Sequence, residues 1–442
     1  MADVTVADMK GADVTVADFA ASVSAASWDD LDPREFDRLR RLVGAAGGRG
    51  DSTLAAMSDE QIARSLGVAL VEDGRTHLCA GAVLLFGQPE ALRAHVPNHE
   101  AAIQVIGPET GEPTDGMNDF FRWPLLRLTE ELLARFRARN PEREIRYELV
   151  RTGVPAYAEQ AFRELLANAF VHRDYTAAGA VHVQWTGEGV EISSPGGYAD
   201  AVRDPAARLL ARPPRPRSPL LADAFRRAGI TDRSGRGIRR AHAAQLRNGL
   251  AAPDHTGSTA DTVVAVLPRQ PADLAFALFA VGREYGGRPL ALPDLLVLTA
   301  GLGGRTLRTA DVAELLGTDK DRARRHLTDM VHNGLMDVAS GGGVRIWVPS
   351  AQVRRALRDD ASQLHARSPR PTRRGERAGF TTAAADAPRG SETAASAGAP
   401  RGSETASAGA PRGSAAAAHP ALRGWAIPEG GPALPARRVS DG

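Results

Sequence analysis

Apolar and polar positions alternate in recognisable periods through the first third of the chain. The apolar runs 80–86 (AGAVLLF) and 101–106 (AAIQVI) are typical of buried strands. Residues 125–137 carry apolar side chains at helical spacing, and the capping pair Ser58 and Gln61 predicts a shorter helix before them. This part of the chain, residues 51–150, is therefore predicted to be an α/β segment.

Both ends of the chain lack such periodicity. The start contains a short duplication, in which residues 2–8 are repeated as 12–18, and residues 1–50 are interpreted as an N-terminal tail. Residues 359–442 are rich in Ala, Pro, Gly, Ser and Arg and contain APRGSET twice. Too few large apolar side chains remain there to offset chain entropy, so this segment is predicted to be a disordered tail.

The middle of the chain contains a helix with two different stripes. The segment 161–172 (AFRELLANAFVH) places apolar residues at the i, i+3, i+4, i+7 positions of one face. Glu164, Asn168 and His172, spaced four apart, form a polar column beside that face. An ordinary solvated face would carry interchangeable charges, whereas a Glu, Asn and His column suits the wall of a pocket. Spacing alone leaves both interpretations open.

Two glycine turns follow this helix. Residues 181–185 alternate as a half-buried strand, and a second strand, 190–193, ends at Ser194, Pro195, Gly196 and Gly197. Glycine there allows close approach of the backbone to a ligand. Gly235 and Gly237 open a later helix, whose first N–H groups favour phosphate, and a strand is predicted at 262–267. The ordered set of helix, hairpin, glycine turn, variable loop and glycine turn indicates a binding pocket with a place for an anion such as phosphate.

These residues resemble the divergent GHKL ATP-binding domain of the RecG-like, Schlafen-associated bacterial transcriptional regulators. The matching segments are RELLANAFVHRDY (163–175), VEISSPGGY (190–198), SPLLADAFRRAGI (218–230) and SGRGIRR (234–240). The resemblance implies a Bergerat-type α/β sandwich over residues 151–270, with ATP and Mg²⁺ as cofactors. It implies that Glu164 is the general base, that Asn168 binds Mg²⁺ and that His172 lies in the same pocket. It also places Gly196 and Gly197 beside adenine, and Gly235 and Gly237 beside the phosphates.

The chain departs from this pattern in two places. GHKL enzymes use an aspartate to accept the adenine amino proton, and Ser194 stands at that position as a weaker acceptor. The N-terminal Schlafen-type segment is not recognisable in residues 1–50. The loop 198–217, where a lid is expected, carries Arg212, Arg215 and Arg217, which would neutralise phosphates or simply keep the loop soluble. A GxxxxGK[ST] loop is absent from the sequence, and the HRD triplet at 172–174 lacks the asparagine that a kinase requires.

Residues 285–350 have the pattern of a winged helix-turn-helix. A helix over 308–316, with Thr309 as its N-cap, precedes a second helix over 318–333 and a hairpin formed by 337–339 and 344–348. Such a fold places its second helix in the DNA major groove. Donors for phosphates and guanine edges come from Lys320, Arg322, Arg324, Arg325 and His326. A dimerisation or protein-docking module is the alternative.

Charge and cysteine content narrow the function further. The net charge is only +2, so any nucleic-acid site must be local, and Cys79 is the single cysteine, which excludes a disulfide framework. His77 and Cys79 are interpreted as packing residues. Without a long apolar run or a leader, the chain is expected to be cytoplasmic, with no membrane contact. The fold class is thus α/β and α+β, multidomain.

The predicted function is that of an ATP-binding, DNA-binding transcriptional regulator. The alternatives are a GHKL-type ATPase that acts in DNA metabolism or defence, and a catalytically dead scaffold. A weak Mg²⁺-dependent ATPase activity and a homo-oligomer are both left open.

Overall fold

The computed structural model describes residues 18–147, 150–197, 215–231, 237–282, 288–341 and 344–366. The N-terminal elements are α1 (Pro33–Ala45), α2 (Asp59–Ser65), β1 (Ala69–Glu72), β2 (Arg75–Leu78), α3 (Ala80–Phe86) and α4 (Pro89–His95). The central ones are β3 (Ala101–Ile106), β4 (Pro113–Phe121), α5 (Leu125–Arg139), β5 (Glu142–Tyr147), β6 (Val150–Pro155), α6 (Glu159–His172), β7 (Val181–Trp185), β8 (Gly189–Pro195), α8 (Pro219–Arg227), α9 (Gly237–Arg247) and β9 (Thr262–Pro268). The last are α10 (Leu274–Gly282), α11 (Leu292–Leu302), α12 (Thr309–Leu316), α13 (Lys320–His332), β10 (Met336–Gly341), β11 (Val344–Pro349) and α14 (Ala351–Ala366).

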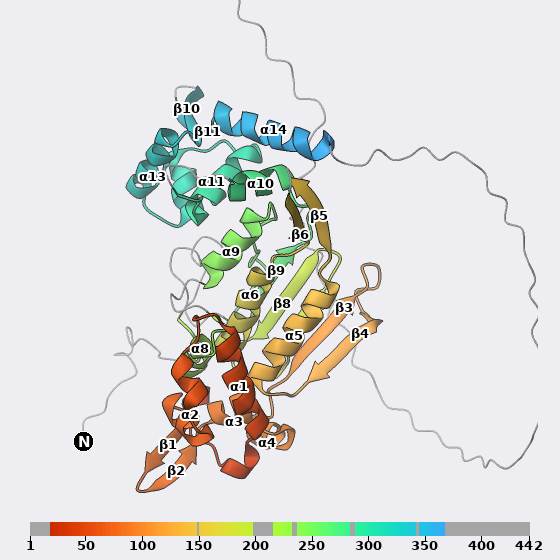
Figure 1. Cartoon of the computed structure of the whole chain (residues 1–442), viewed down its shortest axis with the longest axis vertical. Coiled ribbons are helices and arrows are strands. Elements are labelled where there is room, and N and C mark those ends of the chain that lie inside the picture. Colours follow the sequence, from red (N-terminus) through yellow and green to blue (C-terminus); the bar gives the residue numbers. More distant parts are fainter. Residues whose placement is uncertain are drawn as a thin grey trace, which may run out of the picture. The chain divides into compact units, whose positions relative to one another are not determined.

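A five-stranded mixed sheet forms the centre of the fold, with the strand order β4-β3-β7-β8-β9. β3 and β7 are parallel, and the other neighbours are antiparallel. Strand β7 shows the expected alternation: Val181, Val183 and Trp185 are buried, whereas His182 and Gln184 are half-buried. Helix α6 packs on β8 and β9, and α5 lies beside α6 (Figure 1). The predicted mixed α/β architecture is confirmed.

The N-terminal helices belong to the same core as the sheet. The rings of Phe36 in α1 and Phe86 in α3 stack with centroids 3.9 Å apart, as do those of Phe136 in α5 and Phe162 in α6 at 4.0 Å. One continuous hydrophobic cluster contains all four rings. The prediction of a tail over residues 1–50 is therefore wrong from residue 18 onward, because Phe36 and its neighbours are buried here; residues 1–17 lie outside the described residues.

Residues 80–86 were expected to form a strand and instead form helix α3. All seven residues are buried, so the segment has no polar face from which a period of 2 or 3.6 could be read. The neighbouring hairpin β1–β2 supplies the strands of this region instead. The other elements predicted before residue 140, namely the short helix capped by Ser58 and Gln61, the strand 101–106 and the helix 125–137, are confirmed as α2, β3 and α5.

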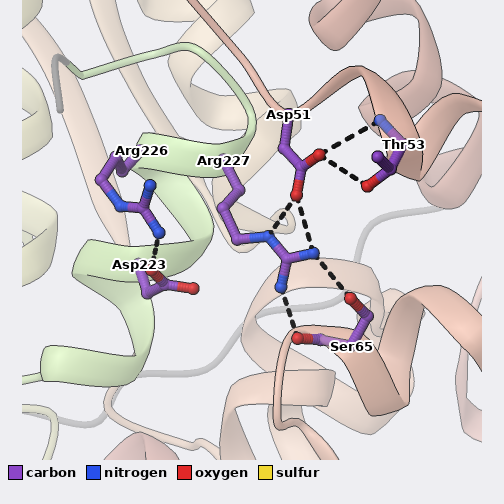
Figure 2. Close-up of polar contacts among 6 residues, drawn as sticks. All are labelled: Asp51, Thr53, Ser65, Asp223, Arg226 and Arg227. Carbon is purple, nitrogen blue, oxygen red and sulfur yellow. Dashed lines mark hydrogen bonds and ion pairs between the residues drawn. The ribbon is translucent and has the colours of Figure 1, made fainter.

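An ion-pair cluster joins α8 to the N-terminal region (Figure 2). Arg227, the last residue of α8, lies 2.9 Å from the Asp51 carboxylate through Nη2, and the same nitrogen donates to Ser65 Oγ at 2.6 Å. Its Nη1 donates to the Ser65 carbonyl oxygen. In return, the Asp51 amide donates to the Arg227 carbonyl oxygen at 2.8 Å. One side chain thus connects α8 to the start of the helical turn Ser52–Ala56, which Asp51 caps, and to the end of α2.

The C-terminal helices and the β10–β11 hairpin surround a second hydrophobic core. The helices α12 and α13 and the hairpin were predicted, and Gly317 ends α12 in the left-handed conformation with φ 60°. Thr309 is not the N-cap, however: Arg308 holds that position, and the Thr309 hydroxyl accepts a hydrogen bond from Trp347 Nε1 at 3.1 Å. The expected tail boundary at Asp359 also lies too early, because α14 continues to Ala366 and Asp360 is buried. Residues 367–442 lie outside the described residues.

No helix within the described ranges combines the length and the apolar character needed to cross a bilayer.

Candidate nucleotide-binding site

The polar column of α6 is present and lies beside the sheet. The helix starts at Glu159 and ends at His172, and its apolar side chains Phe162, Leu165 and Leu166 are buried. Glu164 is only 2% exposed although it carries a carboxylate. Carboxylates are rarely buried without a specific role, because desolvation of the charge is costly. The structure thus separates Glu164 from ordinary solvated helix positions.

A cavity lies between α6, strands β8 and β9, and the start of α9. Asn168 and His172 of the predicted column line it, together with Ser194 from β8. Its apolar walls come from Leu165, Ala169, Ile192, Ile238, Val263 and Ala265. The cavity volume is about 40 Å³, room for about three water molecules, so a purine would require the walls to move apart.

Gly237 brings the first residue of α9 directly against the column. A Cβ atom at this position would lie 2.7 Å from Glu164 Oε2 and 3.8 Å from Asn168 Nδ2. Any larger residue would displace the carboxylate, so glycine is needed for this close approach. The carboxylate, the amide and the beginning of a helix therefore converge at one point. Gly235 lies outside the described residues.

The Asn168 amide has capacity for a further partner. Its Nδ2 atom is buried and forms no hydrogen bond within the part of the chain that the structure describes. The oxygen and the nitrogen of an asparagine amide are distinguished only by their hydrogen bonds, so the observation means that one of these two atoms lacks a partner. Buried polar groups are normally satisfied. The observation fits a ligand or a metal-bound water at Asn168.

Ser194 connects the sheet to α6. The residue is 2% exposed, and its hydroxyl donates a hydrogen bond to the Ala169 carbonyl oxygen at 2.9 Å. The oxygen retains lone pairs and can still accept a hydrogen bond from a ligand. An aspartate here would place a carboxylate against that carbonyl, so serine suits the packing while giving a neutral acceptor in the cavity.

The cavity contains neutral imidazoles. Burial lowers the pKa of His172 to about 4, with a contribution from Arg217. His255, which also lines the cavity, has its pKa lowered to about 4 by burial and by His242, and the two rings lie with centroids 6.1 Å apart. Neither residue carries charge at neutral pH. His255 was not singled out from the sequence, because it lies in a loop with no periodic pattern around it.

The residues after α6 have structural roles. Arg173 is 1% exposed, and its guanidinium donates to the carbonyl oxygens of Asn98 and Gly179. Gly196, with φ 92°, lies so close to Asp174 that a Cβ would be 2.6 Å from the aspartate Cβ. A Cβ at Gly197 would lie 1.9 Å from the Ala260 carbonyl oxygen. Backbone packing therefore explains both glycines without a ligand.

Arg217 was expected in a lid and is instead tied to the end of α6. It donates to the Gly197 carbonyl oxygen at 2.9 Å and to that of His172 at 3.3 Å, and lies 3.5 Å from Asp174. The rest of the expected lid, 198–214 with Arg212, lies outside the described residues, and Arg215 is exposed.

The predicted DNA-contacting residues lie on α13. Lys320, Arg322, Arg324 and Arg325 are exposed. His326 points elsewhere: its Nε2 is 3.4 Å from Asp294, a fully buried carboxylate that also contacts Arg288 at 2.7 Å. The structure thus groups four of the five residues on a solvent-facing surface and places the fifth at the contact between α13 and α11.

A comparison with protein families supports an ATPase-like domain in the part of the chain that contains β7, β8 and β9. A family model described as "Putative ATP-dependent DNA helicase recG C-terminal" matches residues 179–267, from the start of the β7 hairpin to β9. The match includes Ser194, Gly196 and Gly237 but begins after α6. A second model, "Domain of unknown function (DUF8451)", matches residues 10–102.

The fold also resembles a solved structure, that of the DIP2311 protein from Corynebacterium diphtheriae. The TM-score is 0.64 at 21% identity, over 77% of this chain and 66% of that one, which shows similarity of fold. The comparison with curated proteins found no match.

Proposed function

We propose that this protein is a nucleotide-binding regulator that contacts DNA through its C-terminal helices. The observation that carries the proposal is the convergence of Glu164, Asn168 and Gly237 at one point beside an apolar cavity. A carboxylate, an amide with an unsatisfied end and a helix N-terminus form a suitable donor set for a nucleotide phosphate and its Mg²⁺. The ATPase-like family match over β7 to β9 supports the same assignment.

Each residue of this set has a proposed task. Asn168 would hold Mg²⁺ through its amide oxygen, and Glu164 would orient or deprotonate the attacking water. Bound Mg²⁺ would neutralise charge on the phosphates. Ser194 would accept a hydrogen bond from the base, against the apolar surface of Ile192 and Val263. Because the cavity is small, binding would have to separate α9 from the sheet.

Helix α9 provides a physical route from this pocket to the C-terminal helices. Its first residue, Gly237, touches Glu164, while Ala243 and Leu246 belong to the second hydrophobic core. Arg247 near its end donates to the Leu290 carbonyl oxygen at 3.1 Å. A shift of α9 on nucleotide binding would therefore be felt in the helices that we propose form a winged helix, α11 to α13 with the β10–β11 hairpin.

Calorimetric titration with Mg-ATP tests the nucleotide half of the proposal. We expect Glu164→Gln to bind ATP but lose turnover, and Asn168→Ala to lose the Mg²⁺-dependent part of the affinity. Glu159→Gln is the matched control, since it removes a carboxylate from the exposed start of the same helix. Absence of heat with folded wild-type protein would refute nucleotide binding. Binding without turnover would favour the regulator over the ATPase alternative.

The dependence of DNA affinity on salt tests the other half. We expect the double substitution Arg324→Ala and Arg325→Ala to reduce the slope of log affinity against log salt by about two units if both contact phosphates. The equally exposed pair Arg354 and Arg355 on α14 is the control, because its loss changes the net charge by the same amount. Equal slopes for the two double variants would favour the protein-docking alternative.

A further inference from the structure

A second cavity lies on the other side of α6, away from the nucleotide pocket. Helices α1, α5 and α6 and the segment after α8 enclose it, and its volume is about 340 Å³. This volume is in the range of small-molecule sites and far exceeds that of the first cavity. The lining combines apolar side chains with four charged ones: Arg49, Glu130, Arg137 and Arg163.

Two of these charged groups are already paired. Arg137 forms two hydrogen bonds to the Glu159 carboxylate, at 2.8 and 2.6 Å. Glu130 forms an ion pair with Arg38. Their charges are therefore balanced within the protein and contribute little net field to the cavity.

The other two arginines form no close ion pair with a carboxylate within the described ranges. Arg49 uses Nε to donate to the Ala46 carbonyl oxygen at 3.0 Å, and Arg163 has a buried Nε atom with no hydrogen-bond partner. Burial lowers the pKa of Arg163, and the nearby charge of Arg49 lowers it further, whereas the carboxylates of Glu164 and Glu159 act in the opposite direction without offsetting the shift. Two guanidinium groups that repel each other in a partly enclosed space would be stabilised by an anion between them.

The cavity wall is held by close backbone contacts. Gly229, with φ 75°, lies so near Ala46 that a Cβ would be 2.4 Å from the alanine Cβ. A Cβ at Gly50 would lie 3.0 Å from the Arg227 carbonyl oxygen, and Arg227 itself is fixed to Asp51 (Figure 2). The turn after α1 and the end of α8 are thus fitted together. A site on such rigid elements positions its charged groups well for a ligand.

We propose that this cavity binds a small organic anion through Arg49 and Arg163, with the apolar part of the ligand against Leu42 and Leu133. Guanidinium groups match the geometry of phosphate and carboxylate oxygens, so the ligand class is a phosphate ester or a carboxylic acid with an apolar group. Arg163 immediately precedes Glu164 in α6, so the two sites share this helix but use different side chains and lie on different sides of it.

Calorimetry on the full chain with inorganic phosphate, phenyl phosphate and phenylacetate tests the proposal. We expect one of the two phenyl compounds to bind more tightly than inorganic phosphate, and to bind about tenfold more weakly to Arg49→Gln and to Arg163→Gln. Arg93→Gln is the control, since Arg93 is an exposed arginine on α4 with a single carboxylate partner. Arg49 is exposed, so Arg49→Gln keeps the test valid if Arg163→Gln unfolds.

Two outcomes would overturn the proposal. One is the absence of binding by all three probes, or affinities unchanged in both arginine variants. The other is binding that survives both substitutions and is lost in Asn168→Ala, which would assign the anion to the nucleotide pocket. Retention of anion binding in Asn168→Ala together with failure of Mg-ATP to bind would leave this site standing without the proposed nucleotide function.

Discussion

Two adjacent arginines at the end of α8 should differ sharply in their contribution to stability. The Arg227 side chain is 13% exposed and contacts Asp51, which is 27% exposed, as well as two oxygens of Ser65. Among the described residues, the Arg226 side chain pairs with Asp223 of its own helix (Figure 2). Both of these side chains are about 40% exposed. Hydrogen bonds to charged groups contribute about 1.5–3 kcal/mol each, whereas exposed pairs contribute about 0–1 kcal/mol.

We therefore expect Arg227→Ala to lower the free energy of unfolding by about 2–4 kcal/mol, allowing for partial exposure and non-additivity. Arg226→Ala should lower it by less than about 1 kcal/mol. Urea denaturation of the full chain, followed by circular dichroism, measures both differences from the shift in midpoint at constant slope. Because the two variants remove the same side chain from neighbouring positions, they share helix propensity and net charge.

A cycle with Asp51→Ala separates the ion pair from the Ser65 contacts. A coupling free energy near zero between Arg227 and Asp51 would refute a contribution of their ion pair, and equal losses in the two arginine variants would refute the conclusion that Arg227 fastens α8 to the N-terminal region. In the first case the Ser65 hydrogen bonds would be sufficient. In the second the contacts in Figure 2 would be as weak as an exposed pair.

Three further predictions concern stability. Gly196→Ala should lower the free energy of unfolding, measured by urea denaturation, by more than about 2 kcal/mol, because φ is 92° and the new Cβ would meet Asp174. Gly111→Ala, also at positive φ but with open space around it, should lower it by about 1 kcal/mol. Asp294→Asn should lower the unfolding midpoint, because it removes the buried charge that Arg288 contacts; an unchanged midpoint would contradict this. The free energy of unfolding should fall as the pH is lowered from about 6.5 to about 4. Four buried histidines have a pKa of about 4 in the folded protein and stay neutral in this range, whereas the same histidines in the unfolded chain take up protons; they are His99, His172, His242 and His255. A free energy of unfolding that does not change with pH in this range would contradict the burial of these rings.

Periodicity predicted those elements that have one buried and one polar face. Helix α6 and strand β7 are of this kind, and both were located correctly. Helix α3 is buried on all sides, so its sequence shows no alternation of apolar and polar residues from which a helical or strand period could be read. Whether this segment forms a helix or a strand therefore depends on residues that are distant in the sequence, such as Phe36, which packs on Phe86. The same long-range packing orders the start of the chain, where composition alone had suggested a tail.

The candidate site was predictable to the extent that one helix carries it. The spacing of Glu164, Asn168 and His172 placed them on one face, and the structure brings Gly237 to the same point. His255 depends on the path of a loop and left no local signal. For Gly196 and Gly197 the sequence indicated close approach, and the structure places Asp174 and the Ala260 backbone against them.

Helix α9 contributes to two hydrophobic cores at once, Ala241 to the first and Ala243 and Leu246 to the second. The boundary between the ATPase-like domain and the C-terminal helices therefore runs through a helix rather than along a linker. Recombination could not exchange either part as an intact unit, because removal of the chain after β9 would expose an apolar stripe of α9 to water. A homologue with different C-terminal helices would therefore need different residues on the face of α9 that packs against them. The sequence of α9 should then vary together with the sequence of the C-terminal helices.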